Sequence, residues 1–232
     1  MRRKGHLFRI LMVGFMLLSV TGFSDIIFED SFDTTHDYLV DGVAGTGWDG
    51  FIGLGAGETV SQLNASQTAP GVLSIASTNG RWEPDWDPLG PFLYVTVEGD
   101  FTATVQVVGA SSTNWNTAGL AARIADDAAG GAGEDFETME YFQAIGQHMA
   151  RTVDNGVENE FATASPLASY LRLRKAGTLF YHEYSDDGVH WTLMNGSPTT
   201  RDDMDGVPLQ VGIQHATYVS TEGTFEFDDF HL

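Results

Sequence analysis

The stretch that decides the fold is YLRLRKAGTLFYHEYSDDGVHWTLM, residues 170–194. Leu171 and Leu173 alternate with polar and aromatic neighbours, which is the period-two pattern of a half-buried antiparallel strand. The following residues predict two more strand arms joined by SDDGVH, in which Asp-Gly tolerates the positive φ of a tight turn. We expect Ser185 to bond back to the turn backbone and Trp191 to pack in the core or on the hairpin.

The same stretch nearly spells the Asp-box of sialidase propellers, Ser-x-Asp-x-Gly-x-x-Trp. In the box one residue separates Asp from Gly, whereas Asp187 and Gly188 are adjacent here. The box also recurs once per propeller blade, and this chain has a single copy and no 40-residue repeat. The stretch therefore predicts a hairpin and argues against a sialidase.

Strand patterns recur along the rest of the chain, separated by short turns, and no long helical periodicity is present. The clearest is FTATVQVV, residues 101–108, in which Phe, Ala and Val alternate with Thr and Gln. Many short strands at this spacing predict an all-β sandwich or barrel. The other expected strands are 71–77, 91–97, 118–125, 137–145, 209–216 and 223–230.

These segments resemble, in chain order, strands of the concanavalin A-like lectin/glucanase superfamily. The opening stretch is similar to the penultimate hairpin of that fold, and the last 24 residues are similar to its closing pair. FEDSF (28–32), GDFTATVQV (99–107) and NTAGLAARIAD (116–126) resemble earlier strands. The resemblance implies a jelly-roll β-sandwich of two antiparallel sheets over residues 25–232.

The resemblance also implies a class of function. Relatives include laminin-G-like modules, sugar-binding modules and the C-terminal sandwich domains of family 43 glycoside hydrolases. Family 16 glucanases share the fold and are enzymes. Contact with an extracellular glycan is therefore expected, and the fold alone does not decide between binding and hydrolysis.

The first 24 residues have the composition of a secretory signal peptide. Four basic residues precede an apolar run, ILMVGFMLLSV, that is too short for the roughly 20 residues of a membrane span. Gly22 and Ser24 suit signal peptidase, so we expect cleavage near Ser24. A buried N-terminal strand is the alternative. The chain has no cysteine, which together with export favours a secreted bacterial protein.

The charge of the chain limits its partners. The full sequence carries a net charge of −21, and loss of four basic residues with the leader brings it to −25. Such a surface repels the phosphates of nucleic acids and anionic membranes. It suits neutral sugars or divalent cations, although solubility alone would also explain it.

The sequence lacks the catalytic motif of the fold-related glucanases, Glu-x-Asp-x-x-Glu. The closing strand has Glu226, but His231 occupies the place of the second glutamate. Glu137 and Glu140 differ by three positions, so on a strand they point to opposite faces. A pair outside the motif, such as Glu140 with Glu183, remains open. A non-catalytic protein is favoured.

Sugar binding needs flat apolar rings flanked by polar side chains. The segment NGRWEPDWDPLGP, residues 79–91, supplies Trp82 and Trp86 beside Arg81 and Asp85. These tryptophans are our first candidates for stacking on a sugar, and cover of the open end of the sandwich is the alternative. Two further candidates are Trp48 and Trp115.

A structural Ca²⁺ site is expected where the first and last strands meet, as the resemblance implies. Hard cations prefer carboxylate oxygens. The candidate ligands are Glu29, Asp30, Asp228 and Asp229. A solvated acidic edge that deters strand-to-strand aggregation is the alternative.

The sequence therefore predicts a secreted, non-catalytic carbohydrate-binding module that contacts extracellular polysaccharide. Two alternatives stay open. One is a glycoside hydrolase of the same fold whose carboxylates lie outside the known motif. The other is a structural or adhesive surface module that contacts other modules of a surface assembly and holds no small ligand.

Overall fold

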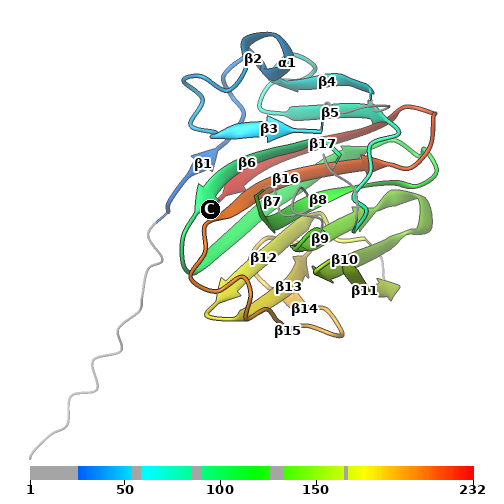
Figure 1. The fold of residues 1–232 in the computed structure, drawn as a ribbon. Coiled ribbons are helices and arrows are strands. Elements are labelled where there is room, and N and C mark those ends of the chain that lie inside the picture. Colours follow the sequence, from blue (N-terminus) through cyan, green and yellow to red (C-terminus); the bar gives the residue numbers. More distant parts are fainter. Residues whose placement is uncertain (1–25, 54–58, 85–89, 126–132, 165–166) are drawn as a thin grey trace, which may run out of the picture.

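The computed structural model describes residues 26–53, 59–84, 90–125, 133–164 and 167–232. They form two antiparallel β-sheets that pack face to face (Figure 1). The prediction of an all-β protein with two antiparallel sheets is confirmed. The leader, residues 1–24, lies outside the described residues. The helices in the described ranges are α1 (Tyr38–Asp41) and the 3₁₀ turn η2 (Gln143–Ile145), and neither is long enough to cross a membrane.

The larger sheet, sheet A, has the strand order β14-β13-β12-β7-β17-β5-β4-β2, with β1 on β17 and β15 on β13. Glu29 is opposite His231 in the β1–β17 pair, so the first and last strands are neighbours. The strands are β1 (Glu29–Asp30), β2 (His36–Asp37), β4 (Thr59–Ala65), β5 (Leu73–Thr78), β7 (Phe101–Ala110), β12 (Tyr170–Ala176), β13 (Leu179–Ser185), β14 (Thr192–Leu193), β15 (Thr199–Thr200) and β17 (Gly223–His231).

The smaller sheet, sheet B, has the strand order β11-β10-β9-β8-β16-β6-β3. Its first four strands form consecutive hairpins, and β16 inserts between β8 and β6. The sequence did not predict the β10–β11 hairpin or β3. The strands are β3 (Gly50–Ile52), β6 (Phe92–Val97), β8 (Asn116–Ile124), β9 (Phe136–Phe142), β10 (Gln147–Asp154), β11 (Val157–Ala164) and β16 (Leu209–Thr217).

The main core lies between the sheets and follows the alternation of the strands. On β7 the predicted inward residues Phe101 and Val105 are buried, and on β8 Leu120 is buried against them in the same cluster. Burial of such side chains contributes roughly 1.5–3 kcal/mol each. The core extends from Phe32, which follows β1, to Leu232, which follows β17, so both ends of the described chain contribute to it.

A second, smaller cluster covers part of the outer face of sheet B, the face turned away from sheet A. We call it the outer cluster. Alternation turns Ala121 of β8 to that face, where Trp82 packs edge-on against Phe92 and Phe136 with ring centroids 5.3 Å apart in each pair. The outer cluster therefore covers one part of the outer face of sheet B with buried side chains, and the rest of that face lies outside the cluster.

The hairpin quoted first has the predicted structure. Ser185 Oγ accepts hydrogen bonds from the N–H groups of Asp187 and Gly188, at 3.2 and 3.0 Å, and Gly188 has a φ of 71°. Trp191 does not enter the core. Its ring lies 4.1 Å from the Arg172 guanidinium, on the outer face of sheet A, so it packs on the hairpin.

Candidate functional site

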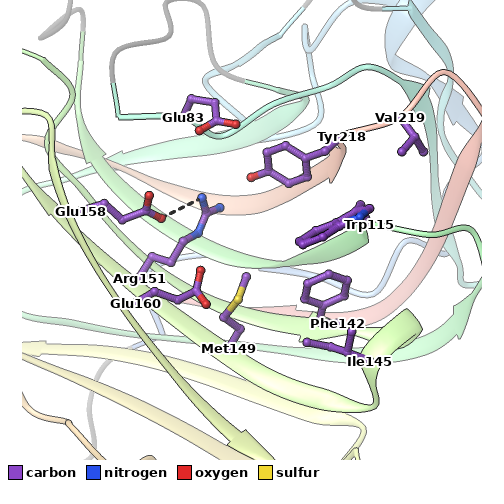
Figure 2. A pocket seen from close by; sticks show the side chains of 10 residues that line it. All are labelled: Glu83, Trp115, Phe142, Ile145, Met149, Arg151, Glu158, Glu160, Tyr218 and Val219. Carbon is purple, nitrogen blue, oxygen red and sulfur yellow. Dashed lines mark hydrogen bonds and ion pairs between the residues drawn. The ribbon is translucent and has the colours of Figure 1, made fainter.

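The outer face of sheet B carries a pocket of about 530 Å³ beside the outer cluster (Figure 2). Aromatic and apolar side chains, Trp115 and Phe142 among them, form one side, and Arg151 with two glutamates forms the other. The lining residues are Glu83, Trp115, Phe142, Ile145, Met149, Arg151, Glu158, Glu160, Tyr218 and Val219.

Strand register explains why the polar side chains meet there. Arg151 on β10 is opposite Glu160 on β11, and both face the same side of the sheet. Glu158 lies two residues before Glu160 and therefore shares that face. The turn between the strands is Asn155-Gly156, with φ values of 48° and 73°, as a two-residue hairpin requires.

The aromatic side of the pocket presents an exposed tryptophan ring. Trp115 is 52% exposed, and its ring centroid lies 5.8 Å from that of Phe142 at an angle of 50°. Tyr218 lies above them and donates its hydroxyl to the carbonyl of Trp82 at 3.2 Å. Burial raises the pKa of Tyr218 to about 12, so the hydroxyl stays neutral.

Beneath the pocket lies a buried ion pair. Arg151 Nε and Nη2 lie 3.0 and 2.7 Å from Glu140 Oε1. The hydroxyls of Thr117 and Thr138 donate to the same carboxylate, so both of its oxygens are occupied. Burial lowers the pKa of Arg151, but the neighbouring Glu140 carboxylate outweighs this and leaves it raised. Glu140 is therefore held by its partners and is not free to react with a ligand.

Acidic groups stand at the rim. Glu158 Oε1 lies 3.4 Å from Arg151 Nη1. The pKa of Glu160 is raised, mainly by partial burial and further by the charges of Glu140 and Glu158, while Arg151 opposes the shift. The pocket thus combines an aromatic wall with hydrogen-bond acceptors and no unpaired cation among its lining residues.

The structure divides the predicted sugar-binding residues. Trp115 lines the pocket, but Trp82 is fully buried and Trp48 is buried in the main core. The expectation that these two tryptophans stack on a sugar is wrong, because their rings are covered by Phe92, Phe136 and the terminal strands. Arg81 does not line the pocket. Trp86 and Asp85 lie outside the described residues.

The predicted metal ligands are only partly brought together. Glu29, Asp30 and Asp229 line one small cavity with His231, and Asp228 does not line it. Asp30 accepts hydrogen bonds from the Phe32 N–H and from Trp48 Nε1, each at 2.8 Å. Both of its oxygens therefore have structural partners, and calcium binding stays a prediction.

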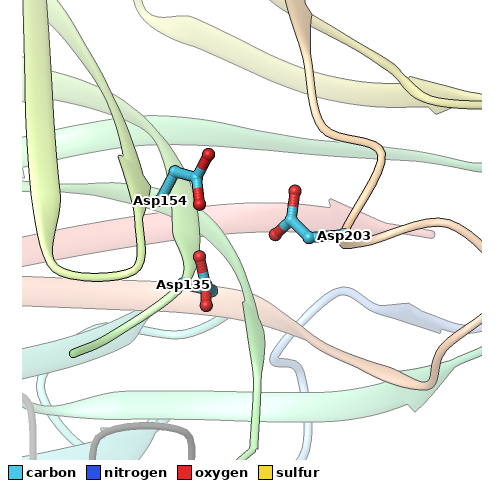
Figure 3. Close-up of side chains that lie close together, drawn as sticks. All are labelled: Asp135, Asp154 and Asp203. Carbon is cyan, nitrogen blue, oxygen red and sulfur yellow. The ribbon is translucent and has the colours of Figure 1, made fainter. Parts of the chain in front are cut away.

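Another acidic group has metal-like spacing. Ligand atoms of Asp135, Asp154 and Asp203 lie within 4.8 Å of one another (Figure 3). The Arg201 guanidinium binds two of the three carboxylates, with Nη2 2.8 Å from Asp135 Oδ1 and 2.6 Å from Asp203 Oδ2. Asp135 and Asp203 therefore belong to an ion-pair network centred on Arg201.

The glutamates considered for catalysis do not form the suggested pair. Glu140 faces the outer side of sheet B, whereas Glu183 pairs with Arg172 on the outer side of sheet A, so the sandwich separates them. Glu137 faces inward and binds Arg201 and His182, so it lies on the opposite face from Glu140, as the spacing predicted. The proposed Glu140–Glu183 pair is wrong.

Sequence reasoning missed most of the pocket. Arg151, Glu158 and Glu160 belong to the β10–β11 hairpin. Phe142 is the last residue of β9 and Tyr218 follows β16, and the sequence of neither strand indicated a site. One signal could have found the hairpin. The run HMARTVDNGVENEF places Asn-Gly between two polar-apolar segments, which is a strong short-range hairpin pattern.

Comparison with known proteins supports the fold. A family model described as "Protein of unknown function (DUF1349)" matches residues 81–232. No curated protein shows significant sequence similarity to the chain. A functionally unknown protein from Saccharomyces cerevisiae is similar in structure, with a TM-score of 0.59 and 16% identity over 80% of this chain and 95% of that one.

Two glycoside hydrolases are also similar in structure. The GH43 BlXynB protein from Bacillus licheniformis has a TM-score of 0.65 and 15% identity, over 87% of this chain and 38% of that one. The catalytic domain of an endo-1,3-β-glucanase (laminarinase) from Thermotoga petrophila has a TM-score of 0.55 and 12% identity, over 89% and 96%. The fold is thus the concanavalin A-like jelly-roll sandwich that the sequence predicted, and this chain spans about two fifths of the GH43 protein.

Proposed function

Because the chain belongs to the DUF1349 family, whose description assigns no activity, we propose its function from the pocket on sheet B: it is a carbohydrate-binding module that holds a neutral glycan there. The observation that carries the proposal is the half-exposed ring of Trp115, supported by Phe142 and facing the carboxylates of Glu158 and Glu160.

The two sides of the pocket suit the two chemical faces of a sugar. The C–H groups of a pyranose are apolar and pack on a flat ring such as Trp115, which releases water from both. Sugar hydroxyls donate hydrogen bonds, and carboxylates at the rim accept them strongly. A ligand lying between Trp115 and Glu160 would use both sides at once.

Charge selects a neutral ligand. Glu83, Glu158 and Glu160 line the pocket, and Arg151 is already paired with Glu140. The chain as a whole is strongly acidic. Uronic acids and sulfated sugars would be repelled, so we expect neutral hexose or pentose chains to bind. The endo-1,3-β-glucanase among the similar structures makes a β-1,3-glucan a reasonable first probe.

Isothermal titration calorimetry tests the proposal with laminaritetraose and xylotetraose as neutral probes and trigalacturonate as the anionic control. Trp115→Ala should weaken binding roughly tenfold, because an aromatic contact of this kind contributes on the order of 1–2 kcal/mol. Tyr181→Ala removes an aromatic ring from the outer face of sheet A and should change little. Equal binding by the Trp115→Ala variant would refute the assignment of the pocket.

Hydrolysis is the second candidate, and one observation favours it. Glu158 lies beside the Arg151 guanidinium, whereas the pKa of Glu160 is raised, so two carboxylates of one pocket have different surroundings. Glycosidases divide the roles of acid and base between such carboxylates. Release of reducing sugar from laminarin or xylan that is abolished by Glu160→Gln and by Glu158→Gln would favour the enzyme. No release with retained binding favours the module.

We propose further that the chain acts outside the cell. The composition of residues 1–24 supports export. N-terminal sequencing of the protein recovered from the medium or the periplasm tests this, and a chain that keeps its first residues inside the cell would contradict it. If neither sugar binding nor sugar release is found, a structural module of a surface assembly becomes the better proposal.

A further inference from the structure

A second groove, of about 350 Å³, lies on the outer face of sheet A, on the opposite side of the sandwich from the pocket. It runs between β7, β12, the end of β17 and the turn that precedes Trp191. Its walls include Tyr170, Trp191, Thr104 and Asp229. We propose that this groove is a second carbohydrate site, which holds a neutral saccharide unit between Trp191 and Asp229.

Trp191 is fixed for such a role. The Arg172 guanidinium lies 4.1 Å from its ring centroid and is itself held by Glu183, with Arg172 Nε 2.7 Å from Glu183 Oε2. One face of the indole is therefore covered by a cation whose position is set by an ion pair. The ring still lines the groove, so it offers a ligand a flat apolar surface in a defined orientation.

The turn before Trp191 is rigid as well. Asp187 Oδ1 accepts hydrogen bonds from the N–H groups of Val189 and His190, at 2.9 and 2.8 Å. Gly188 lies so close to Tyr170 that a Cβ atom there would be 3.2 Å from its ring. The groove is therefore largely formed before a ligand enters, which reduces the entropy lost on binding.

The rest of the groove supplies polar partners for hydroxyl groups. Thr104 on β7 is opposite His231 on β17, and both line the groove. Asp229, at the β17 bulge, has a φ of 49° and projects an exposed carboxylate at the same wall. Hydroxyl, imidazole and carboxylate groups beside an aromatic ring match the donors, acceptors and C–H face of a sugar.

Charge again points to a neutral ligand. Arg172 is the only arginine among the described residues that line the groove, and it is paired with Glu183, which Arg174 also contacts at 3.7 Å. The lining carboxylates of Asp187 and Asp229 outnumber it. An anionic sugar would be repelled. Two sugar sites on opposite faces would let one molecule contact two glycan chains, and the linked contacts would strengthen attachment to a polysaccharide beyond either site alone.

Two-dimensional NMR of ¹⁵N-labelled protein tests the proposal through the tryptophan indole N–H signals. Trp115→Phe and Trp191→Phe assign the two signals. The probes are glucose, galactose, mannose, xylose, laminaritetraose and xylotetraose. We expect the Trp191 signal to shift saturably with at least one probe, both in the unmodified chain and in Trp115→Ala. A Trp191 signal that moves with none of the six overturns the proposal, whatever the Trp115 signal does.

Asp229→Asn provides the matched variant, because asparagine tolerates the same positive φ and keeps the side-chain shape. It should weaken binding at the Trp191 signal roughly tenfold, as expected for loss of a charged acceptor, and leave the Trp115 signal unaffected. An unchanged affinity would show that Asp229 does not contact the saccharide, and would overturn its placement between Trp191 and Asp229. Galacturonate should shift the Trp191 signal at least tenfold more weakly than galactose, and equal binding of the two would overturn the neutral ligand class.

Discussion

Arg151 and Glu140 form a buried ion pair on the outer face of sheet B, with Arg151 Nη2 2.7 Å from Glu140 Oε1. Arg151 Nη1 also donates to the carbonyl of Trp82, so one side chain connects β9, β10 and the segment that closes the outer cluster. The pair forms the base of the pocket. The Glu140 carboxylate is therefore engaged by its partners and is not a free acid or base in the pocket.

Breaking this pair should destabilise the fold strongly. Arg151→Met leaves the Glu140 carboxylate buried without its partner, which costs about 3–5 kcal/mol. Urea unfolding measures the loss. Arg174→Met is the matched control, since Arg174 is a partly exposed arginine on sheet A, and it should change the free energy of unfolding by about 0.5 kcal/mol or less. The double variant Arg151→Met/Glu140→Met should recover part of the loss, and simple additivity of the two single variants would contradict a coupled pair.

Two buried histidines should make the fold sensitive to mild acid. Burial lowers the pKa of His148 to about 4 and that of His215 to about 3. Both values lie below the 6.5 of the unfolded chain, so unfolding takes up protons in this range. Stability should be complete above pH 6.5 and fall as the pH drops from 6.5 towards 4. Urea midpoints at several pH values measure this, and His148→Gln should flatten the slope. A midpoint that is constant between pH 7 and 4.5 would be inconsistent with neutral buried histidines.

Substitution of Trp82 should lower stability, whereas substitution of Trp115 should weaken sugar binding and leave stability nearly unchanged. Trp82 is enclosed by the outer cluster, so Trp82→Ala should cost about 3–5 kcal/mol through the cavity it leaves. Trp115→Ala removes a half-exposed ring and should change stability by about 0.5 kcal/mol. Thermal or urea unfolding of the two variants checks this, beside the calorimetric titration of the folded Trp115→Ala protein. A large loss of stability in Trp115→Ala would make that ring a packing residue.

Binding at the pocket should weaken in acid. Partial burial and neighbouring carboxylates raise the pKa of Glu160, so this group takes up its proton at a higher pH than an ordinary glutamate. As the pH falls through that raised pKa, the carboxylate stops accepting two hydrogen bonds from a sugar. The affinity for laminaritetraose or xylotetraose should therefore decrease as the pH falls, and the decrease should begin at a higher pH than an ordinary glutamate would give. Glu160→Gln should remove most of this pH dependence, and a persistent dependence would assign it to another group.

Calcium binding at the paired terminal strands remains our proposal, and it can be tested without a sugar. If Glu29 and Asp229 hold Ca²⁺, added calcium should raise Tm and EDTA should reverse the increase, because an ion that binds only the folded chain stabilises it. Glu29→Gln should abolish the effect, and Glu98→Gln, a change outside the lining of this cavity, should not. An unchanged Tm with millimolar calcium would favour a solvated acidic edge.

The sequence by itself determined the fold class. Period-two alternation in β7, the β12–β13 hairpin with its Ser-Asp-Asp-Gly turn, and the closing strands are local patterns, and each predicted its element correctly. Local patterns suffice here because a strand with one buried face must alternate, and a tight turn needs residues that accept its backbone angles.

The site was decided by tertiary structure. Trp82, Trp48 and Trp115 look alike in the sequence, each a tryptophan in a polar or glycine-rich segment. Only packing partners far along the chain bury the first two and leave the third exposed. The alternation of apolar and polar residues shows which side chains share a face of a strand. Strand order and register decide which outer side chains of different strands meet. Register between β9, β10 and β11 brings Arg151 to Glu140 and Glu160, and Tyr218, the residue after β16, lines the same pocket. These long-range pairings depend on the whole sandwich, and for that reason the sequence predicted the scaffold and missed most of the pocket.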